Sequence, residues 1–145
     1  MIVVDTGAML ALLDAGEDQH RVVRDLYEAK PEAWILPWAI LPEVDYLVAK
    51  HLGAKAQETF LRDLAADAFS VEWGRDGDLE VAYRICTRYR SLRLGLVDAA
   101  VIATAERLGA EAIATFDLRH FGAVSIKGNP RLVPRDAEIV DQATK

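Results

Sequence analysis

The chain has 145 residues, of which 52% are hydrophobic and 28% charged, and this composition is typical of one soluble globular domain. It contains no run of about 20 apolar residues for a membrane span, and its single cysteine, Cys86, excludes an internal disulfide and a thiolate metal cluster. The net charge of −6 argues against binding to nucleic acid, unless bound cations neutralise part of the acidic charge.

Other general features indicate a cytoplasmic protein. No basic segment precedes the first apolar stretch, which Asp5 interrupts, so we expect no signal peptide. Cys86 lies among helically spaced apolar residues, which predicts a buried core thiol rather than a nucleophile. We expect a single domain over residues 1–145, with a peripheral, solvated tail after about residue 134.

The first predicted elements meet at Asp5. The β-branched apolar run at residues 2–4 ends at this carboxylate and gives way to a helical pattern over residues 8–13. The pattern predicts a buried parallel strand with a helix directly after it. Ligands bind at the carboxyl ends of strands in open α/β sheets, so Asp5 lies where a functional group is expected. The alternative is that Asp5 only caps the N-terminus of the helix.

The rest of the chain alternates between helical and strand patterns. Apolar residues at helical spacing predict further helices over residues 19–29, 38–51, 54–66, 79–89 and 97–108, the last of them closed by Gly109. Strands are predicted at residues 33–36, 69–73, 112–115 and 131–133. This alternation predicts an α/β fold with a mainly parallel sheet and helices on both of its faces.

Four acidic residues occupy special positions in this pattern. Asp5 and Asp117 each follow a predicted strand, and Asp98 and Glu43 lie in the first turns of predicted helices. These positions converge at one crevice when the strand order of a parallel sheet reverses. At a separation of about 4 Å and an effective dielectric constant of about 20, each ionised pair repels by about 4 kcal/mol, so the cluster needs protons or bound cations. Oxygen ligands without a Cys or His partner favour Mg²⁺ or Mn²⁺ over Zn²⁺.

Each acidic residue also has an ordinary structural explanation. Asp98 and Glu43 complement the helix dipole in a first turn, and Asp45, on another face of the same helix, competes with Glu43 for a functional role. Asp117 would suit a turn at residues 118–120. The coincidence of four such positions in one chain favours a shared site over four separate explanations.

Together these segments resemble the PIN domain family, and within it the VapC-type toxins of type II toxin–antitoxin systems. The resemblance extends to about residue 133 and rests on four segments in the family's order, Val3-Val4-Asp5-Thr6, Pro42-Glu43-Val44-Asp45-Tyr46-Leu47, Leu94-Gly95-Leu96-Val97-Asp98-Ala99-Ala100 and Ile113-Ala114-Thr115-Phe116-Asp117-Leu118-Arg119-His120-Phe121. No single segment is specific, but four in this order at the family's spacing form a strong signal. The resemblance implies a PIN-like three-layer α/β/α fold with a central, mainly parallel sheet of four to five strands.

The resemblance also implies roles for individual residues. The family's acidic quartet and the hydroxyl after its first member correspond to Asp5, Glu43, Asp98, Asp117 and Thr6. The acids would hold Mg²⁺ or Mn²⁺, with the three aspartates as the more direct ligands, while Glu43 would orient metal-bound water or act as a base. Thr6 would hydrogen-bond a phosphate oxygen or a water molecule. Gly7 departs from the family, which often has a small polar residue there.

The function implied by the resemblance is that of an endoribonuclease toxin. It would cleave RNA phosphodiester bonds with a carboxylate-held metal and an activated water, and a cognate VapB-type antitoxin would inhibit it. A homodimer is expected on the same grounds. Arg119 and His120 would contact the RNA backbone, although a surface turn is the ordinary explanation for them. A basic run, Arg84, Arg88, Arg90 and Arg93, would steer RNA, although a solvated helix face and the loop after it are the ordinary explanation.

Two other functions remain as alternatives. A catalytically silent PIN-like module would bind RNA or protein through the same fold. A Mg²⁺-dependent phosphatase or receiver-type protein that forms an aspartyl phosphate also places Asp at a strand end. Phosphatases of the haloacid-dehalogenase type need a second Asp two residues after the first, and Gly7 occupies that position here.

Overall fold

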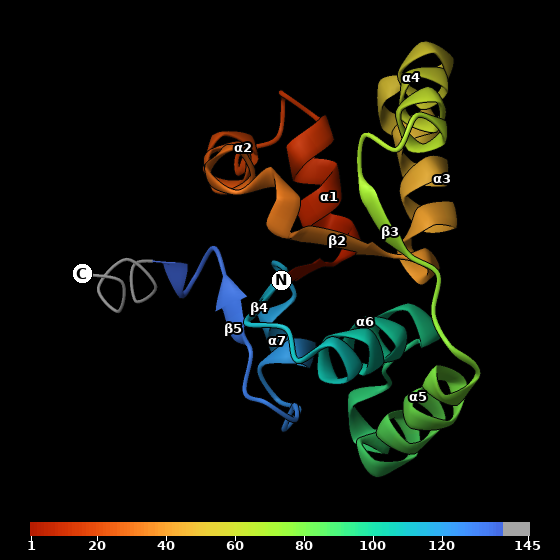
Figure 1. The fold of residues 1–145 in the computed structure, drawn as a ribbon, viewed down its shortest axis with the longest axis vertical. Helices are drawn as coiled ribbons and strands as arrows, with labels where there is room; N and C mark the ends of the chain where they lie inside the picture. The colour runs from red at the N-terminus through yellow and green to blue at the C-terminus, as the bar shows by residue number, and fades with distance from the viewer. Residues whose placement is uncertain (138–145) are drawn as a thin grey trace.

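The computed structural model describes residues 1–137 and is built around a parallel sheet (Figure 1). Its strands are β1 (Ile2–Val4), β2 (Trp34–Pro37), β3 (Ser70–Glu72), β4 (Ala112–Ala114) and β5 (Arg131–Val133). They lie in the order β3-β2-β1-β4-β5, and every neighbouring pair is parallel. The predicted α/β fold and all five predicted strands are confirmed. Most of the predicted solvated tail, residues 138–145, lies outside the described residues.

Helices cover both faces of the sheet. They are α1 (Thr6–Leu13), α2 (His20–Ala29), α3 (Leu41–Leu52), α4 (Ala54–Ala65), α5 (Asp76–Arg88), α6 (Leu96–Leu108) and α7 (Leu118–Phe121). Figure 1 shows α1 to α4 on one side of the sheet and α5 to α7 on the other. The chain runs from β1 outward to β3 and then returns past β1 to β4, and right-handed crossovers in opposite directions place their helices on opposite faces. No helix within residues 1–137 combines the length and apolar character that a membrane crossing requires.

The strand order creates a crevice beside β1. The chain leaves β1 toward β2 on one side and comes back to β4 on the other, so the order reverses between β1 and β4. Val4 pairs with Ala114, and the next residues along the chain, Asp5 and Thr115, therefore leave the sheet at the same level. The carboxyl ends of these two strands position the site described below.

The central strands are apolar throughout because helices cover them on both faces. Val3, Val4 and Ile113 are fully buried, and Met9 of α1 and Ile102 of α6 belong to the same core. The middle of α6 is buried on all sides, with small residues that let it pack closely between the sheet and α5. The buried part of this helix begins at Ala99, directly after Asp98.

Three details differ from the predicted elements. The helix expected from Trp38 begins as a 3₁₀ turn, and α3 starts only at Leu41, with Pro42 in its first turn, where a missing N–H costs nothing. The turn expected after Asp117 is the short helix α7. Cys86 packs against the core but stays partly exposed, with its thiol 3.6 Å from the carbonyl oxygen of Leu94, so the predicted burial is only partial.

Candidate active site

Asp5 lies at the junction of β1 and α1. Its backbone N–H donates to the carbonyl oxygen of Ala114 at 2.9 Å, which extends the pairing of β1 with β4 beyond the strands. Asp5 is only 7% exposed. Its Oδ1 accepts a hydrogen bond from the Thr6 N–H at 2.8 Å, and its Oδ2 accepts one from the Thr115 hydroxyl at 2.9 Å. Asp5 thus caps α1, as the structural alternative expected, and also lies at the crevice.

Burial dominates the ionisation of Asp5. It raises the pKa of this carboxyl from 3.8 to about 6, although the hydrogen bonds from Thr115 and Thr6 act in the opposite direction. The negative charges of Asp98 and Asp117 raise the pKa further. Three aspartates from three separate segments are therefore close enough to repel one another.

Thr115 connects two of these aspartates. Its hydroxyl donates to Asp5 Oδ2 at 2.9 Å and accepts the backbone N–H of Asp117 at 3.0 Å. Thr115 is 1% exposed, and its hydrogen bond to Asp5 is buried, whereas the one from Asp117 is partly buried. Sequence reasoning missed this residue. The available signal was a small hydroxyl at the end of a buried strand, two residues before a candidate ligand.

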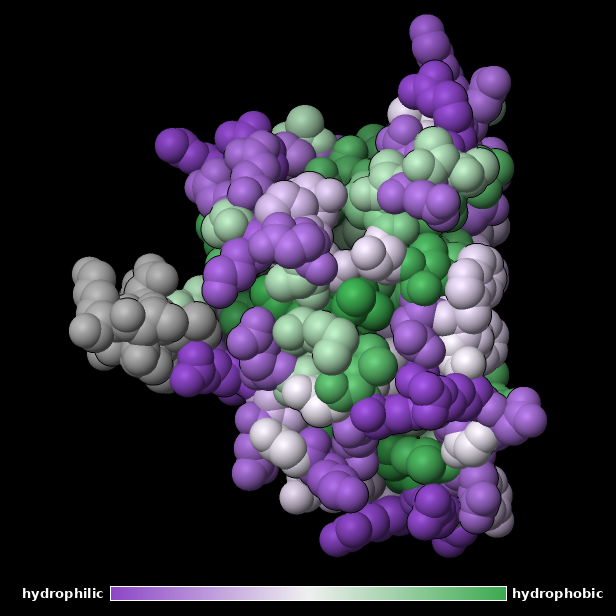
Figure 2. Space-filling model, in the orientation of Figure 1, coloured by the Kyte–Doolittle hydropathy of each residue, from purple (hydrophilic) through white to green (hydrophobic). Residues whose placement is uncertain are grey.

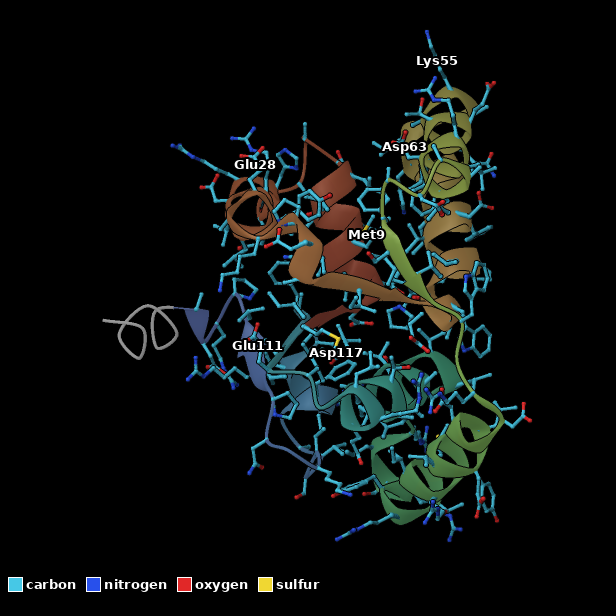
Figure 3. The ribbon with its side chains drawn as sticks, in the orientation of Figure 1. Met9, Glu28, Lys55, Asp63, Glu111 and Asp117 are labelled. Carbon is cyan, nitrogen blue, oxygen red and sulfur yellow. The ribbon has the colours of Figure 1, made fainter. Side chains whose placement is uncertain are left out.

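Asp117 and His120 form the outer part of the cluster. Asp117 caps α7 by accepting the His120 N–H on Oδ1 at 3.2 Å, and its Oδ2 lies 2.8 Å from His120 Nδ1. The same nitrogen is 3.5 Å from Oδ2 of Asp98. In Figure 3 Glu111 and Asp117 mark the two ends of β4, and Asp117 is the one nearer α6. The helix that replaced the expected turn is what folds His120 back onto the carboxylates.

Asp98 joins the cluster from the first turn of α6. Burial raises the pKa of this carboxyl, the charges of Asp117 and Glu43 raise it too, and His120 lowers it. Glu43, exposed in the first turn of α3, is therefore near enough to repel Asp98. Asp45, the alternative to Glu43 on the same helix, accepts a hydrogen bond from Gln57 of α4 at 2.9 Å. Its carboxylate therefore has a structural partner in the neighbouring helix.

Thr6 brings an unused hydroxyl to the site. It is 5% exposed, and among the described residues its Oγ1 has no hydrogen-bond partner. A buried hydroxyl without a partner is costly, and a ligand or water oxygen at the crevice would satisfy it. Gly7 is exposed, and no atom lies within 4 Å of the position that a Cβ would take. The departure from the family pattern at Gly7 therefore leaves no gap in the packing.

The donor set fits a small divalent cation. One oxygen of Asp98, one oxygen of Asp117 and one ring nitrogen of His120 all lie within 4.8 Å of one another. Adjacent ligands about 2.1 Å from an octahedral ion are about 3 Å apart, close to the 2.8 Å and 3.5 Å separations from His120 Nδ1 to the two aspartates. The structure adds a ring nitrogen to the carboxylates that the sequence predicts as ligands, and the carboxylate ligand set stays a prediction.

The basic residues expected at the substrate are spread over several places. Arg119 is exposed on α7, and Arg93 is exposed directly after a 3₁₀ turn, Arg90–Leu92. Arg88 ends α5, with its guanidinium carbon 5.6 Å from the centre of the Tyr89 ring. Of the four expected substrate contacts, His120 is the one that lies among the carboxylates.

Comparisons with known proteins point to one family. The PIN domain model matches residues 2–127. Ribonuclease VapC26 of Mycobacterium tuberculosis is 35% identical over 130 residues, which make up 90% of this chain and 96% of that protein.

Solved structures share the same fold. Mycobacterium tuberculosis VapC20, described as a sarcin-ricin loop cleaving toxin, has a TM-score of 0.77 at 23% identity, over 88% of this chain and 98% of that one. A toxin–antitoxin complex from Klebsiella pneumoniae has a TM-score of 0.64 at 22% identity, over 86% of this chain and 92% of that one.

Proposed function

The chain belongs to the PIN domain family, as a relative of the VapC ribonucleases, and on that premise we propose that it is a metal-dependent endoribonuclease toxin. The observation that carries the proposal is the meeting of Asp5, Asp98 and Asp117 at the crevice beside β1, with Glu43 close to Asp98. Crowded carboxylates with raised pKa values are unfavourable by themselves and become favourable around a bound cation.

Asp5, Asp98 and Asp117 would hold Mg²⁺ or Mn²⁺. When bound, such a cation polarises a phosphate and lowers the pKa of water toward neutrality. Glu43, exposed beside Asp98, would accept the proton of the attacking water. The unpartnered hydroxyl of Thr6 would donate a hydrogen bond to a phosphate oxygen. These groups are held by strand ends and helix starts, so little rearrangement is needed when substrate binds.

The proposed substrate is RNA, in line with the name of the VapC26 relative. Arg119, Arg88 and Arg93 are exposed cations that would contact the RNA backbone. An RNA substrate and a chain with a single, unpaired cysteine both agree with the cytoplasm as the compartment in which the protein acts.

We also propose that a VapB-type antitoxin inhibits this protein and that the protein forms a homodimer. The Klebsiella pneumoniae relative was solved as a toxin–antitoxin complex, which supports a protein partner here. Tyr46 and Leu52 of α3 and Leu61 of α4 are exposed apolar side chains that such a partner would cover.

The aspartyl-phosphate alternative finds little support in the site. Gly7 stands where a phosphatase of the haloacid-dehalogenase type would need its second aspartate. An RNA-cleavage assay distinguishes the enzyme from a catalytically silent binding module.

The proposal is tested by cleavage of total cellular RNA with purified, antitoxin-free protein. We expect Mg²⁺ or Mn²⁺ to support cutting at discrete sites and EDTA to abolish it. Asp5→Asn and Asp98→Asn should lower the cleavage rate by at least about a hundredfold while the protein stays folded. Asp45→Asn is the matched control, because Asp45 is a carboxylate of α3 that binds Gln57.

Two results would contradict the nuclease. Cleavage that survives both substitutions would trace the activity to a contaminant. Metal-loaded protein that binds RNA without cutting it would establish the silent binding module.

A further inference from the structure

A cavity of about 900 Å³ lies between α5 and α6, apart from the carboxylate cluster. We call it the α5–α6 cleft. Apolar side chains form part of its lining, and they are Val81 and Ile85 of α5, Ala103 of α6 and Val124 from the segment after α7. In Figure 2 hydrophilic side chains surround a small apolar area over α5. None of the four candidate catalytic acids lines the cleft.

The cleft gathers cations that have no carboxylate partner. Arg75, Arg84, Arg88 and Lys127 line it, and within residues 1–137 none of them forms an ion pair. The fifth cation, Arg107, is neutralised by Glu72 and Asp78. The acidic residues in the lining are Asp78 and Glu106. The lining therefore has five cations and two carboxylates, so a chain with a net charge of −6 concentrates positive charge at this concave place.

The acidic site and one end of the cleft lie at different levels of α6. Asp98 is in its first turn and Arg107, which lines the cleft, comes nine residues later, about 13 Å along the helix axis. This exceeds the Debye length of about 8 Å at physiological ionic strength, so repulsion between the carboxylate cluster and an anion near that end of the cleft is largely screened. Phosphates close to the metal-free carboxylates would instead be repelled. Binding of a polyanion to the metal-free protein therefore depends on cations outside the carboxylate cluster.

We propose that the α5–α6 cleft binds RNA phosphates outside the scissile bond, an inference that rests on the proposed ribonuclease function. Three of the four unpaired cations are arginines, whose guanidinium groups bind phosphate oxygens through paired N–H donors. Arg84 and Arg88 are one helical turn apart, so they present two such groups on the same face of α5. The apolar part of the lining would accept a ribose or a base.

This assignment divides the basic run that the sequence presents as a unit. Arg84 and Arg88 line the cleft together with Arg75 and Lys127, which are distant in sequence. Arg90 and Arg93 lie in and after the following 3₁₀ turn and do not line it. Substitutions within one short segment should therefore have different effects on RNA binding.

The test measures RNA binding without cleavage. Asp98→Asn protein in EDTA is titrated against a fluorescein-labelled single-stranded RNA of mixed sequence over a range of NaCl concentrations. Adding Arg84→Ala and Arg88→Ala should raise Kd about tenfold at low salt and reduce the slope of log Kd against log salt by about 1.4, since each lost phosphate contact on single strands contributes about 0.7. Arg84→Lys with Arg88→Lys should keep the slope, because the charge is kept.

A matched pair of cations on the other side of the sheet serves as the control. Lys55 and Arg62 lie on α4, and Figure 3 shows Lys55 at the end of the molecule away from α5. Lys55→Ala with Arg62→Ala removes the same charge and should leave the salt slope unchanged. An equal loss of slope in this control would mean that overall charge, not the cleft, attracts RNA, and the proposal would be overturned.

Two further results separate failure of the cleft from failure of the proposed function. If the protein cleaves RNA and the Arg84→Ala and Arg88→Ala changes leave both Kd and KM unaltered, the cleft does not bind substrate. If those changes weaken only the association with an acidic protein partner, the cleft belongs to that partner and the inference is also wrong. If the protein never cleaves RNA but its RNA affinity depends on Arg84 and Arg88, RNA binding in the cleft is supported and the proposed nuclease activity is wrong.

Discussion

Asp5 has two roles that favour opposite protonation states. As the cap of α1 it accepts hydrogen bonds, which stabilise the anion, whereas burial beside Asp98 and Asp117 favours the neutral acid and raises its pKa to about 6. Because the folded pKa lies above the unfolded value of 3.8, the folded state binds the proton more tightly. Ionisation of Asp5 therefore destabilises the metal-free fold as the pH rises from about 4 to above 6, by about 3 kcal/mol in full.

We expect Asp5→Asn to raise the free energy of unfolding of the metal-free protein near pH 7.5 by up to about 3 kcal/mol. Near pH 4 the gain should be much smaller, because wild-type Asp5 is then protonated in the fold. Urea unfolding in EDTA at both pH values measures the difference. A gain of the same size at both would show that ionisation of Asp5 is not the cause.

A ligand role for His120 would change the metal preference expected of the site. Its Nδ1 lies 2.8 Å from an oxygen of Asp117 and 3.5 Å from one of Asp98, where a third ligand to a shared ion would be. An imidazole nitrogen suits Mn²⁺ better than Mg²⁺, which prefers oxygen alone.

His120→Gln should therefore weaken Mn²⁺ binding by about tenfold or more and Mg²⁺ binding by much less. Titration calorimetry with each ion gives the two affinities, and electron paramagnetic resonance of the Mn²⁺-loaded protein reports whether a nitrogen is coordinated. His51→Gln, at an exposed histidine in the last turn of α3, is the control. Equal losses for both ions, without a nitrogen signal in the wild type, would make His120 a counter-charge to the carboxylates rather than a ligand.

Among the helices and strands, Arg107 links α6, on which it lies, to the edge strand β3 and to α5. Arg107 of α6 binds Glu72 at the end of β3 at 2.6 Å, and it binds Asp78 in the first turn of α5 at 2.8 Å. Burial raises the pKa of Asp78, but the hydrogen bond from Arg107 and its charge outweigh burial and hold the pKa below its ordinary value. Asp78 therefore stabilises the fold above its unfolded pKa, and this contribution is lost as the pH falls through the folded pKa.

Arg107→Ala should lower the free energy of unfolding by about 3 kcal/mol at neutral pH, since it leaves buried Asp78 without its cation. The loss should become smaller as the pH falls from the ordinary aspartate pKa of 3.8 through the lower pKa of folded Asp78. Urea unfolding measures both values. Arg24→Ala is the comparison, because its pair with Glu28 is exposed and 3.8 Å long, and it should change stability by less than about 0.5 kcal/mol. Similar losses in the two variants would mean that the Arg107 contacts contribute no more than a surface pair.

The molecule as a whole separates its charges. The candidate catalytic acids lie at the crevice beside β1, and four unpaired cations line the α5–α6 cleft on the side of the sheet covered by α5 and α6. The net charge of −6 is therefore an average over an acidic site and a basic cleft, and it does not describe the local charge at either place.

A divalent cation should stabilise the whole fold through the acidic cluster. We expect MgCl₂ or MnCl₂ at 100 times its Kd to raise the free energy of unfolding by about 2.7 kcal/mol, because the unfolded chain has no assembled site. Thermal unfolding at constant ionic strength, with NaCl as the comparison, measures the change. Asp98→Asn should abolish it. Stabilisation that persists in this variant would place the cation elsewhere.

Local patterns in the sequence were sufficient to predict the elements. Strands and helices follow from apolar periodicity, and their ends follow from residues such as Asp5, Gly95 and Gly109, whose preferences act over a few neighbouring positions. The same patterns placed four acids at strand ends and helix starts. The order of the four motifs matches that of the family. The amino-acid sequence by itself therefore determined the α/β fold and the identity of the candidate acids.

Which side chains meet was decided by the arrangement of those elements in space. The hydrogen bond from Thr115 to Asp5 joins residues 110 positions apart, and Arg107 contacts Glu72 across 35 positions. Such contacts depend on which strands become neighbours, and strand patterns carry no information on that order. For the same reason His120 at the carboxylates, the turn of Asp45 toward Gln57 and the division of the basic run became visible only in the folded chain.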